Sequence, residues 1–483
     1  MWRTGGDSRY GPSVSIMGGE SHPMARPTFT PTGRERQFDH HELFFSTTDP
    51  KGVILSGNDV FVRVSGYSRE ALVGTAHNII RHPDIPQAVF KLLWDYLDAG
   101  KPFAGYVKNM AADGGFYWVT VLVVPIQQGY LSVRFKPSTG LLPVVDSVYK
   151  QMLAVEKKAA TEPGGWRLGM QRAAELLMGV LKSKGFSTYD DFMQMLLATE
   201  LKSHRAMAAR RALRAVGTDA SLESMLTECG GVDGELGALF DRMGSFLSLV
   251  KQLDEKAIFL KDLASSMHLV SLNALIGACG QGEGGEGFSV VTQDLAALSE
   301  DGTATIDVMT RELMTLTSSL RDTAFSINAA MLQVEMTTFF LRELASRSND
   351  WEHSSTGHII RQDIVTLRES FRKSVEAIAA AIARASQPIP TLLRMERTLG
   401  NDLRRMSAVR LIGKIQATGL GGEAHFHEML DRILEQLTRA SQELEELTAG
   451  VSSLERLLPD LQQAARGVQA RTCGCETLLH VAA

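Results

Sequence analysis

The distribution of proline constrains this 483-residue chain more than any other single feature. Eleven of the fifteen prolines lie in the first 143 residues, and none lies between residues 164 and 387. At average usage one proline is expected roughly every 20 residues, so this gap is long. Because proline removes a helix hydrogen-bond donor and clashes with the preceding turn, the gap is typical of long helices. The sequence therefore predicts an N-terminal mixed part followed by a long helical part.

The composition is that of a globular protein, with 44% hydrophobic residues, 22% charged residues and a formal net charge of −5. This mild charge argues against nucleic acid as a partner, because nucleic acid is recognised by a strongly basic field. No run of 18 or more apolar residues occurs, so we expect no membrane span. Four cysteines form no disulfide framework, and the default location is cytoplasmic. Cys473 and Cys475 lack the further ligands that a tetrahedral metal site needs.

A small domain with both strands and helices is expected between His40 and Lys136. Runs rich in β-forming residues predict five strands, and helical periodicity predicts two helices between the second and third strands. The strands are expected at 43–47, 52–55, 105–109, 116–124 and 130–135, and the helices at 58–64 and 87–97. Residues 1–36 are rich in Gly, Pro, Ser and Arg and lack an apolar run, so we expect a disordered leader.

The helical part carries a regular seam of apolar and small residues. From Leu236 to Ala278 these residues recur in alternating steps of three and four, which is the 3.5-residue repeat of a coiled coil or helical bundle. At about 1.5 Å per residue this seam predicts a rod of roughly 65 Å. The glycine-rich run 280–287 ends the rod, and helix resumes at Phe288, which predicts an antiparallel hairpin. A second seam runs from Leu430 to Leu461.

An internal repeat links the two seams. Seven residues of 267–282 find identical residues 139 positions later, each set ending in a glycine cluster. If the two regions are repeats, one subunit can build a four-helix bundle by itself; chance identity and a bundle between two copies of the chain are the alternatives. The expected order is a helical connector over 139–235, a hairpin over 236–345 with its tip near 277–287, a second hairpin over 346–472 and a tail over 473–483.

Two patterns in the helical part look like functional motifs but are better explained by helix geometry. The G-x-G-x-x-G pattern occurs twice in 280–287, but it follows a helix rather than a strand, and Glu283 and Glu286 would repel a pyrophosphate. His425 and His427 lie two positions apart on an expected helix, so they face different directions and cannot share a metal ion.

The densest unusual chemistry of the first domain lies in residues 78–86, Asn-Ile-Ile-Arg-His-Pro-Asp-Ile-Pro. Trp94 and the run Tyr-Val-Lys-Asn at 106–109 follow it. The two prolines rigidify a loop, and Asp84 can cap the helix after it. On composition alone this segment is a structural loop with solvated charges.

These residues closely resemble the PAS domain of bacterial aerotaxis receptors over about 95 residues. Ser-Thr-Thr-Asp-Pro at 46–50, Val-Ser-Gly-Tyr-Ser at 64–68 and Phe-Tyr-Trp-Val at 116–119 continue the resemblance. It implies an α+β PAS sensor domain over 37–138, with a five-stranded antiparallel sheet, helices across one face, and FAD bound non-covalently as a redox sensor. The cofactor-binding residues that it implies are Arg81, His82, Asp84, Trp94, Phe103 and Asn109.

The implied site has one departure and several alternatives. Phe103 stands where the family usually has tryptophan, which keeps an apolar stacking surface but loses the indole donor. Haem bound by His77 or His82 is one alternative cofactor, and a PAS domain without a cofactor is another. A flavoprotein oxidoreductase is the enzymatic alternative. If flavin is bound, we expect its reduction to be transmitted through the strand at 130–135 into the helices beyond Leu141.

Residues around the glycine-rich run resemble the hairpin tip of methyl-accepting chemotaxis proteins over about 30 residues. The resemblance implies that Asn273, Glu283 and Phe288 contact the chemotaxis coupling protein and histidine kinase. Gly277 and Gly280 stand where the family usually has glutamate and arginine, so the contact surface is divergent. We therefore expect a cytoplasmic, non-enzymatic transducer for energy taxis, with a PAS regulator that does not engage the kinase as the alternative.

Overall fold

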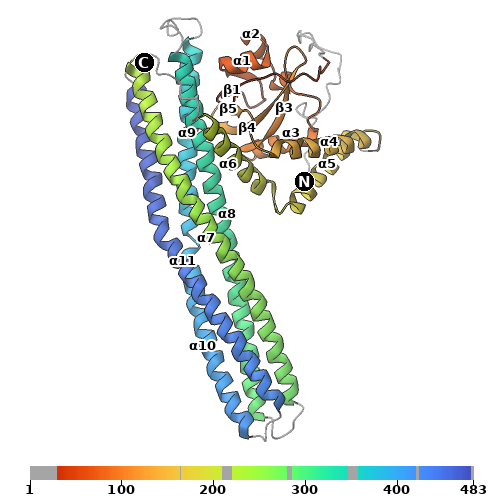
Figure 1. The fold of residues 1–483 in the computed structure, drawn as a ribbon, viewed down its shortest axis with the longest axis vertical. Coiled ribbons are helices and arrows are strands. Elements are labelled where there is room, and N and C mark those ends of the chain that lie inside the picture. The colour runs from red at the N-terminus through yellow and green to blue at the C-terminus, as the bar shows by residue number, and fades with distance from the viewer. Residues whose placement is uncertain are drawn as a thin grey trace. The chain divides into compact units, whose positions relative to one another are not determined.

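A computed structural model describes residues 30–163, 165–208, 220–279, 286–345, 357–419 and 424–479. The chain forms two compact units (Figure 1). Unit 1 comprises residues 1–236, 325–375 and 469–483, and unit 2 comprises residues 237–324 and 376–468. Each unit is therefore built from segments that lie far apart in the sequence.

Unit 1 contains a five-stranded antiparallel sheet with the strand order β2-β1-β5-β4-β3. Because successive side chains in a strand point to opposite faces, each inner strand has one face toward the local helices and one toward the rest of the unit. The strands are β1 Phe44–Thr48, β2 Ile54–Gly57, β3 Phe103–Met110, β4 Phe116–Ile126 and β5 Gly129–Phe135. The expected α+β class with a five-stranded antiparallel sheet is confirmed, with strand ends within two residues of the predicted ones.

Four short helices connect β2 to β3 and cover one face of the sheet (Figure 1). Asn58 caps the first of them by accepting a hydrogen bond from the backbone N–H of Phe61, and Gly66 ends it with a φ of 73°. The helices are α1 Asp59–Ser65, α2 Arg69–Leu72, the 3₁₀ helix η1 His77–Ile80, and α3 Gln87–Asp98. The loop between η1 and α3 thereby lies beside the sheet.

Residues 32–36 lie along the hairpin formed by β3 and β4. The backbone N–H of Thr32 donates to the carbonyl of Gly114 at 2.9 Å, and that of Arg36 donates to the carbonyl of Phe116 at 2.7 Å. Arg34 also pairs with Asp113 at 2.5 Å. Residues 32–36, which the sequence placed in the expected leader, therefore pair with the sheet domain through their backbone.

Three further helices follow the sheet, and two of them bond to its edge strand β3. The hydroxyl of Tyr149 donates to the carbonyl of Tyr106 at 3.0 Å, and that of Tyr189 donates to the carbonyl of Ala104 at 3.1 Å. The helices are α4 Leu141–Ala159, α5 Gly165–Ser183 and α6 Tyr189–Ala208. The two hydroxyls therefore satisfy carbonyl groups that β3, as an edge strand, cannot pair within the sheet.

Long helices make up the rest of the described chain: α7 Ala220–Cys279, α8 Glu286–Ala345, α9 Gly357–Ser386, α10 Ile389–Gly419 and α11 Ala424–Leu479. Pro388 lies between α9 and α10, where a helix break is expected because proline disfavours helical continuation. Within the described residues no helix has both the length and the apolar character that crossing a membrane requires.

Within unit 2 these helices pack side by side (Figure 1). Lys261 of α7 pairs with Asp307 of α8 at 2.9 Å, and Lys414 of α10 pairs with Asp431 of α11 at 3.0 Å. The described seam residues of α7 from Leu239 to Ala264 and those of α11 from Leu430 to Leu461 are buried. The expected all-α bundle after the sheet domain is therefore confirmed.

Candidate functional site

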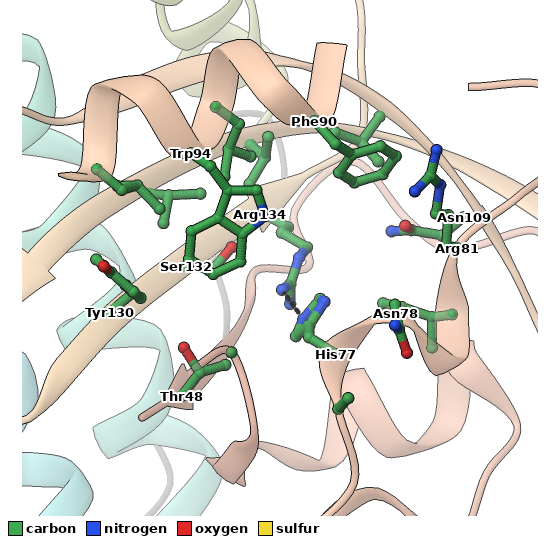
Figure 2. Close-up of a pocket in the computed structure, with 18 of the residues that line it drawn as sticks. Thr48, His77, Asn78, Arg81, Phe90, Trp94, Asn109, Tyr130, Ser132 and Arg134 are labelled. Atoms are coloured by element: carbon green, nitrogen blue, oxygen red, sulfur yellow. Dashed lines mark hydrogen bonds between the residues drawn. The ribbon is translucent and has the colours of Figure 1, made fainter. Parts of the chain in front are cut away.

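A cavity of about 140 Å³ lies between the sheet and its covering helices in unit 1 (Figure 2). This space is well above the roughly 10–15 Å³ that one water molecule needs. Side chains from β1, η1, α3, β3, β4 and β5 line it, about half of them apolar. The polar or aromatic lining residues are Thr48, Lys51, His77, Asn78, Arg81, Phe90, Trp94, Asn109, Tyr130, Ser132 and Arg134.

Three of the residues that the sequence predicted for the site line this cavity: Arg81, Trp94 and Asn109. The guanidinium of Arg81 lies 4.2 Å from the centre of the Phe90 ring, and its backbone forms a bridge with Asn109. The Trp94 ring meets the Tyr130 ring edge-on, with centroids 5.6 Å apart. The structure therefore brings a cation, an amide and an indole together around one space (Figure 2).

His82 and Asp84 were predicted for the same site, but neither lines the cavity. Nδ1 of the buried His82 accepts a hydrogen bond from the backbone N–H of Asp84 at 3.1 Å. Burial and the nearby Lys108 lower the pKa of His82 to about 4, so the imidazole is neutral near pH 7. Asp84 is exposed and pairs with Lys108 at 2.6 Å. These contacts shape the loop that carries Arg81.

Phe103, the third predicted residue outside the lining, is fully buried on β3. Its ring stacks on Tyr189 of α6, with centroids 5.6 Å apart, and meets Tyr96 of α3 edge-on at 6.0 Å. This position therefore joins the sheet to its neighbouring helices.

Arg134 of β5 is a charged residue of the cavity that the sequence did not single out. Its side chain is buried, with Nη2 donating to Ser46 Oγ at 2.8 Å and to His77 Nε2 at 2.5 Å. Among the described residues, Nη1 has no hydrogen-bond partner. Burial lowers the pKa of Arg134 to about 10, so the group stays charged at neutral pH. A buried cation with an open donor at a cavity favours an acceptor-bearing ligand.

His77 lies in direct hydrogen-bond contact with Arg134 at the cavity (Figure 2). Because a guanidinium can only donate, Nε2 of His77 accepts the bond and the ring proton resides on Nδ1. Burial, and then the charge of Arg134, lower the pKa of His77 well below its ordinary value. A neutral imidazole is therefore held with its acceptor nitrogen occupied.

The partner-contact residues predicted for the helical tip belong to unit 2. Asn273 is exposed on α7, and Phe288 falls within α8. Glu283 lies outside the described residues.

The sheet, its covering helices and the cavity define a PAS domain, because residues 54–132 match a family model described as the PAS fold. Among individual proteins, the aerotaxis receptor of Escherichia coli (strain K12) is 37% identical over 139 residues, which are 28% of this chain and 26% of the receptor. This match confirms the resemblance to aerotaxis-receptor PAS domains.

More distant relatives match a shorter segment. The nitrogen fixation regulatory protein of Klebsiella pneumoniae is 30% identical over 81 residues, which are 17% of this chain and 16% of that protein. A solved PAS domain from Colwellia psychrerythraea is 20% identical, covers 20% of this chain and 85% of its own, and has a TM-score of 0.18. The chain thus spans about a quarter or less of the length of the curated relatives it matches. These relatives carry the names of a receptor and a regulator.

Proposed function

We propose that this protein is a cytoplasmic redox and oxygen sensor for energy taxis, which binds FAD in its PAS domain and signals through its helical bundle to the chemotaxis kinase pathway. The observation that carries the proposal is the open donor of buried Arg134 at the cavity of a domain like that of the aerotaxis receptor. In this proposal the protein binds a ligand and transmits a signal, and it does not catalyse a reaction on a substrate.

The chemistry of the cavity fits a flavin nucleotide. The carbonyl-bearing edge of a flavin ring offers acceptors for Arg134 Nη1, and Trp94 offers an apolar face for the ring. Arg81 offers a second cation, which suits a pyrophosphate because guanidinium binds phosphate oxygens in a bidentate way. The same residues that line the cavity therefore match a ring and a phosphate chain.

A bound flavin would supply a reversible change of charge and protonation. Arg134 would stabilise negative charge on the ring edge that it contacts, since it remains charged while buried. His77 Nε2 competes for the same guanidinium, so a stronger acceptor in the cavity draws Arg134 away from His77 and Ser46. The hydrogen bonds around Arg134 would in this way report the redox state.

The visible absorption spectrum of the purified full-length protein tests this proposal. We expect the two bands of oxidised flavin, which bleach on addition of dithionite and return in air. A Soret band would support haem instead, and a colourless protein that takes up no added FAD would contradict any flavin role.

The haem alternative meets a specific obstacle at both candidate histidines. Nε2 of His77 accepts a hydrogen bond from Arg134, and Nδ1 of His82 accepts one from the backbone of Asp84. Iron at Nε2 of His77 would leave its Arg134 donor unpaired, and iron at Nε2 of His82 would move the ring proton to Nδ1 and break the bond from Asp84. The hydrogen bonding therefore favours flavin over haem.

The output half of the proposal draws support from exposed apolar residues of unit 2 near the helix ends at 279, 286, 419 and 424. Exposed large apolar side chains that gather in one region are typical of protein-binding surfaces. They are Leu269, Val290, Leu411, Ile412 and Ile415, which we call the tip set; each is at least half exposed. Leu269 and Val290 belong to the segment that resembles the chemoreceptor tip, and the tip set would contact the coupling protein and kinase.

A further inference from the structure

Strand β1 separates the cavity from two of the long helices within unit 1. Thr48 lines the cavity, and Ser46 accepts the hydrogen bond from Arg134. Phe45 and Thr47 alternate with them and point to the opposite face of the sheet. There the Phe45 ring meets Phe340 of α8 edge-on, with centroids 5.1 Å apart. A change at the cavity thus has only one strand to cross before it reaches α8.

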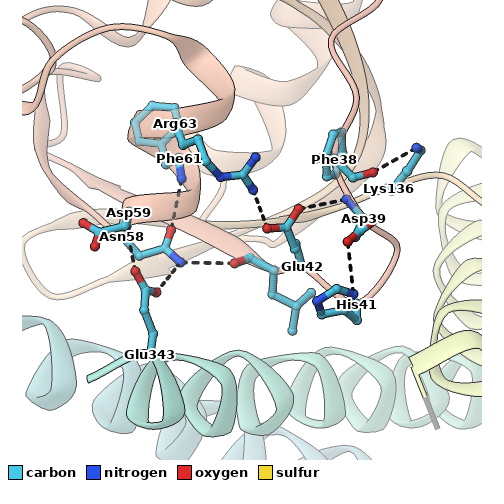
Figure 3. Close-up of polar contacts among 11 residues, drawn as sticks. Phe38, Asp39, His41, Glu42, Asn58, Asp59, Phe61, Arg63, Lys136 and Glu343 are labelled. Carbon is cyan, nitrogen blue, oxygen red and sulfur yellow. Dashed lines mark hydrogen bonds and ion pairs between the residues drawn. The ribbon is translucent and has the colours of Figure 1, made fainter. Parts of the chain in front are cut away.

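The first polar contact across this boundary joins α8 to the residue that caps α1 (Figure 3). Glu343 accepts hydrogen bonds from the Asn58 side-chain amide at 3.1 Å and from the Asp59 backbone N–H at 3.0 Å. The buried Asn58 also accepts from the backbone N–H of Phe45 at 3.2 Å and donates to the carbonyl of Leu43 at 3.1 Å. Asn58 therefore ties the backbone of β1 directly to a carboxylate of α8.

The second contact joins α9 to β2. The Ser56 hydroxyl donates a hydrogen bond to the Asp363 carboxyl group. The hydroxyl oxygen of Thr47, on β1, lies 2.6 Å from the Ser56 hydroxyl oxygen. Asp363 is only 5% exposed. Burial raises the pKa of both Asp363 and Glu343 to about 7. Asp363 is buried and Glu343 is half-buried, and carboxyl groups withdrawn from water depend strongly on each remaining hydrogen bond. Small shifts of β1 and β2 therefore have a large effect on them.

We propose that α8 and α9 are the direct output elements of the PAS domain, and that Glu343 and Asp363 transmit a change at Arg134 across β1 to these helices. The inference rests on the proposed sensor function, and it replaces the expected route through β5 into α4 with a shorter one. A stronger acceptor at Arg134 weakens the bond to Ser46, β1 shifts, and the bonds of Asn58 and Ser56 to the two carboxylates change. The helices respond because each carboxylate loses or gains a hydrogen bond to the sheet domain.

Amide hydrogen exchange on the full-length protein tests this route by comparing the oxidised and dithionite-reduced states. The peptides that matter are those of α8 after residue 333 and of α9 before residue 371. The double variant Glu343→Ala/Asp363→Ala is compared with the double variant Glu300→Ala/Gln362→Ala, whose residues are exposed on the same two helices. In the wild type and the control we expect exchange in α8 and α9 to change at least ~3-fold on reduction.

In the Glu343/Asp363 double variant we expect that change to disappear, while the flavin bands and the exchange response of the cavity strands persist. A response of α8 and α9 that survives in this variant, or a wild-type response confined to α4, would overturn the route and leave the sensor function standing. A wild-type protein without flavin bands would overturn both.

If the alanine variant unfolds, Glu343→Gln/Asp363→Asn keeps the side-chain volume. Glu343 accepts from Asn58 and from Asp59 through separate carboxylate oxygens. A glutamine side chain has one oxygen, and its amide nitrogen can only donate, so one of these two bonds is lost in Glu343→Gln. The same loss of the exchange response is therefore expected at α8.

Discussion

Arg134 keeps its positive charge where burial disfavours it. Its two bonded partners, Ser46 and His77, are neutral, and the ring of Phe61 lies 5.2 Å from its guanidinium carbon. None of these groups offers the full negative charge that usually accompanies a buried cation. A ligand that supplies an acceptor at Nη1 would therefore bind with a favourable charge-assisted bond.

Replacing this residue by Arg134→Gln should weaken FAD binding about 10- to 100-fold, because a hydrogen bond to a charged group contributes roughly 1.5–3 kcal/mol. The measurement is the dissociation constant for FAD from fluorescence titration of the apoprotein. Arg34→Gln is the control, since Arg34 is largely exposed and lies outside the cavity lining. Equal affinities of the two variants would contradict a role for Arg134 in the site.

The sequence pointed to Arg81, Trp94 and Asn109 through their motif, and all three line the cavity. Arg134 was not predicted because it lies in a strand that reads as an ordinary β-strand with apolar residues at every second position. A signal was nonetheless present, because Tyr130, Ser132 and Arg134 alternate with Leu131, Val133 and Phe135, so that the polar set shares one face. An arginine on the helix-covered face of a strand indicates a polar cavity. That its Nη1 has no hydrogen-bond partner among the described residues can be learned only from the three-dimensional structure.

At the scale of elements, the contact between α9 and β2 should depend on pH. The pKa of Asp363 is about 7 in the folded protein and 3.8 in its ordinary state, and the charge that faces it is that of Arg69. Between these two values the folded chain holds a proton that the unfolded chain has released. The stabilisation from the protonated group is therefore complete at low pH and is lost as pH rises through 7.

From pH 8 to pH 6 we expect the free energy of unfolding of the wild type to rise by about 1.4 kcal/mol relative to Asp363→Asn, which does not titrate. Urea unfolding followed by tryptophan fluorescence at pH 6, 7 and 8 measures the difference. Other titrating groups cancel because both proteins contain them. Parallel pH curves for the two proteins would show that Asp363 does not titrate between pH 6 and pH 8 in the folded protein.

The strands, the helices around the cavity and the seams of the long helices followed from periodicity, since buried faces repeat every two or every 3.5 residues. The packing of α8 and α9 against the sheet could not be predicted from periodicity. Ser56 and Asp363 are 307 positions apart, and each is a single polar residue within an otherwise ordinary pattern. Periodicity says that a face is buried, but it does not say which distant element buries it.

At the scale of the whole molecule, the tip set of unit 2 should decide whether the chemotaxis machinery is engaged. Leu411 and Ile415 lie four residues apart on α10, so their side chains share one face. Leu411→Glu/Ile415→Glu should reduce capture of the chemotaxis coupling protein at least ~10-fold, because burying one such side chain contributes roughly 1.5–3 kcal/mol. Helix content measured by circular dichroism should stay unchanged.

Ile258→Glu is the matched control, because Ile258 is 52% exposed on α7 away from the helix ends. Equal capture of both variants, in the presence of wild-type binding, would place the partner surface elsewhere. No capture by the wild type would favour a regulator that acts outside the chemotaxis pathway.

The discontinuous make-up of unit 1 has a consequence for synthesis on the ribosome. The last strand of the sheet ends at Phe135, whereas the segment that covers β1 and β2 extends to residue 375. At about 5–20 residues per second, the nascent sheet waits more than about ten seconds for its partner helices. During that interval Phe45 and the groups that meet Glu343 and Asp363 face solvent or a chaperone. We therefore expect the cavity, whose lining residues all lie between Thr48 and Arg134, to form before the contacts of the sheet with α8 and α9 exist.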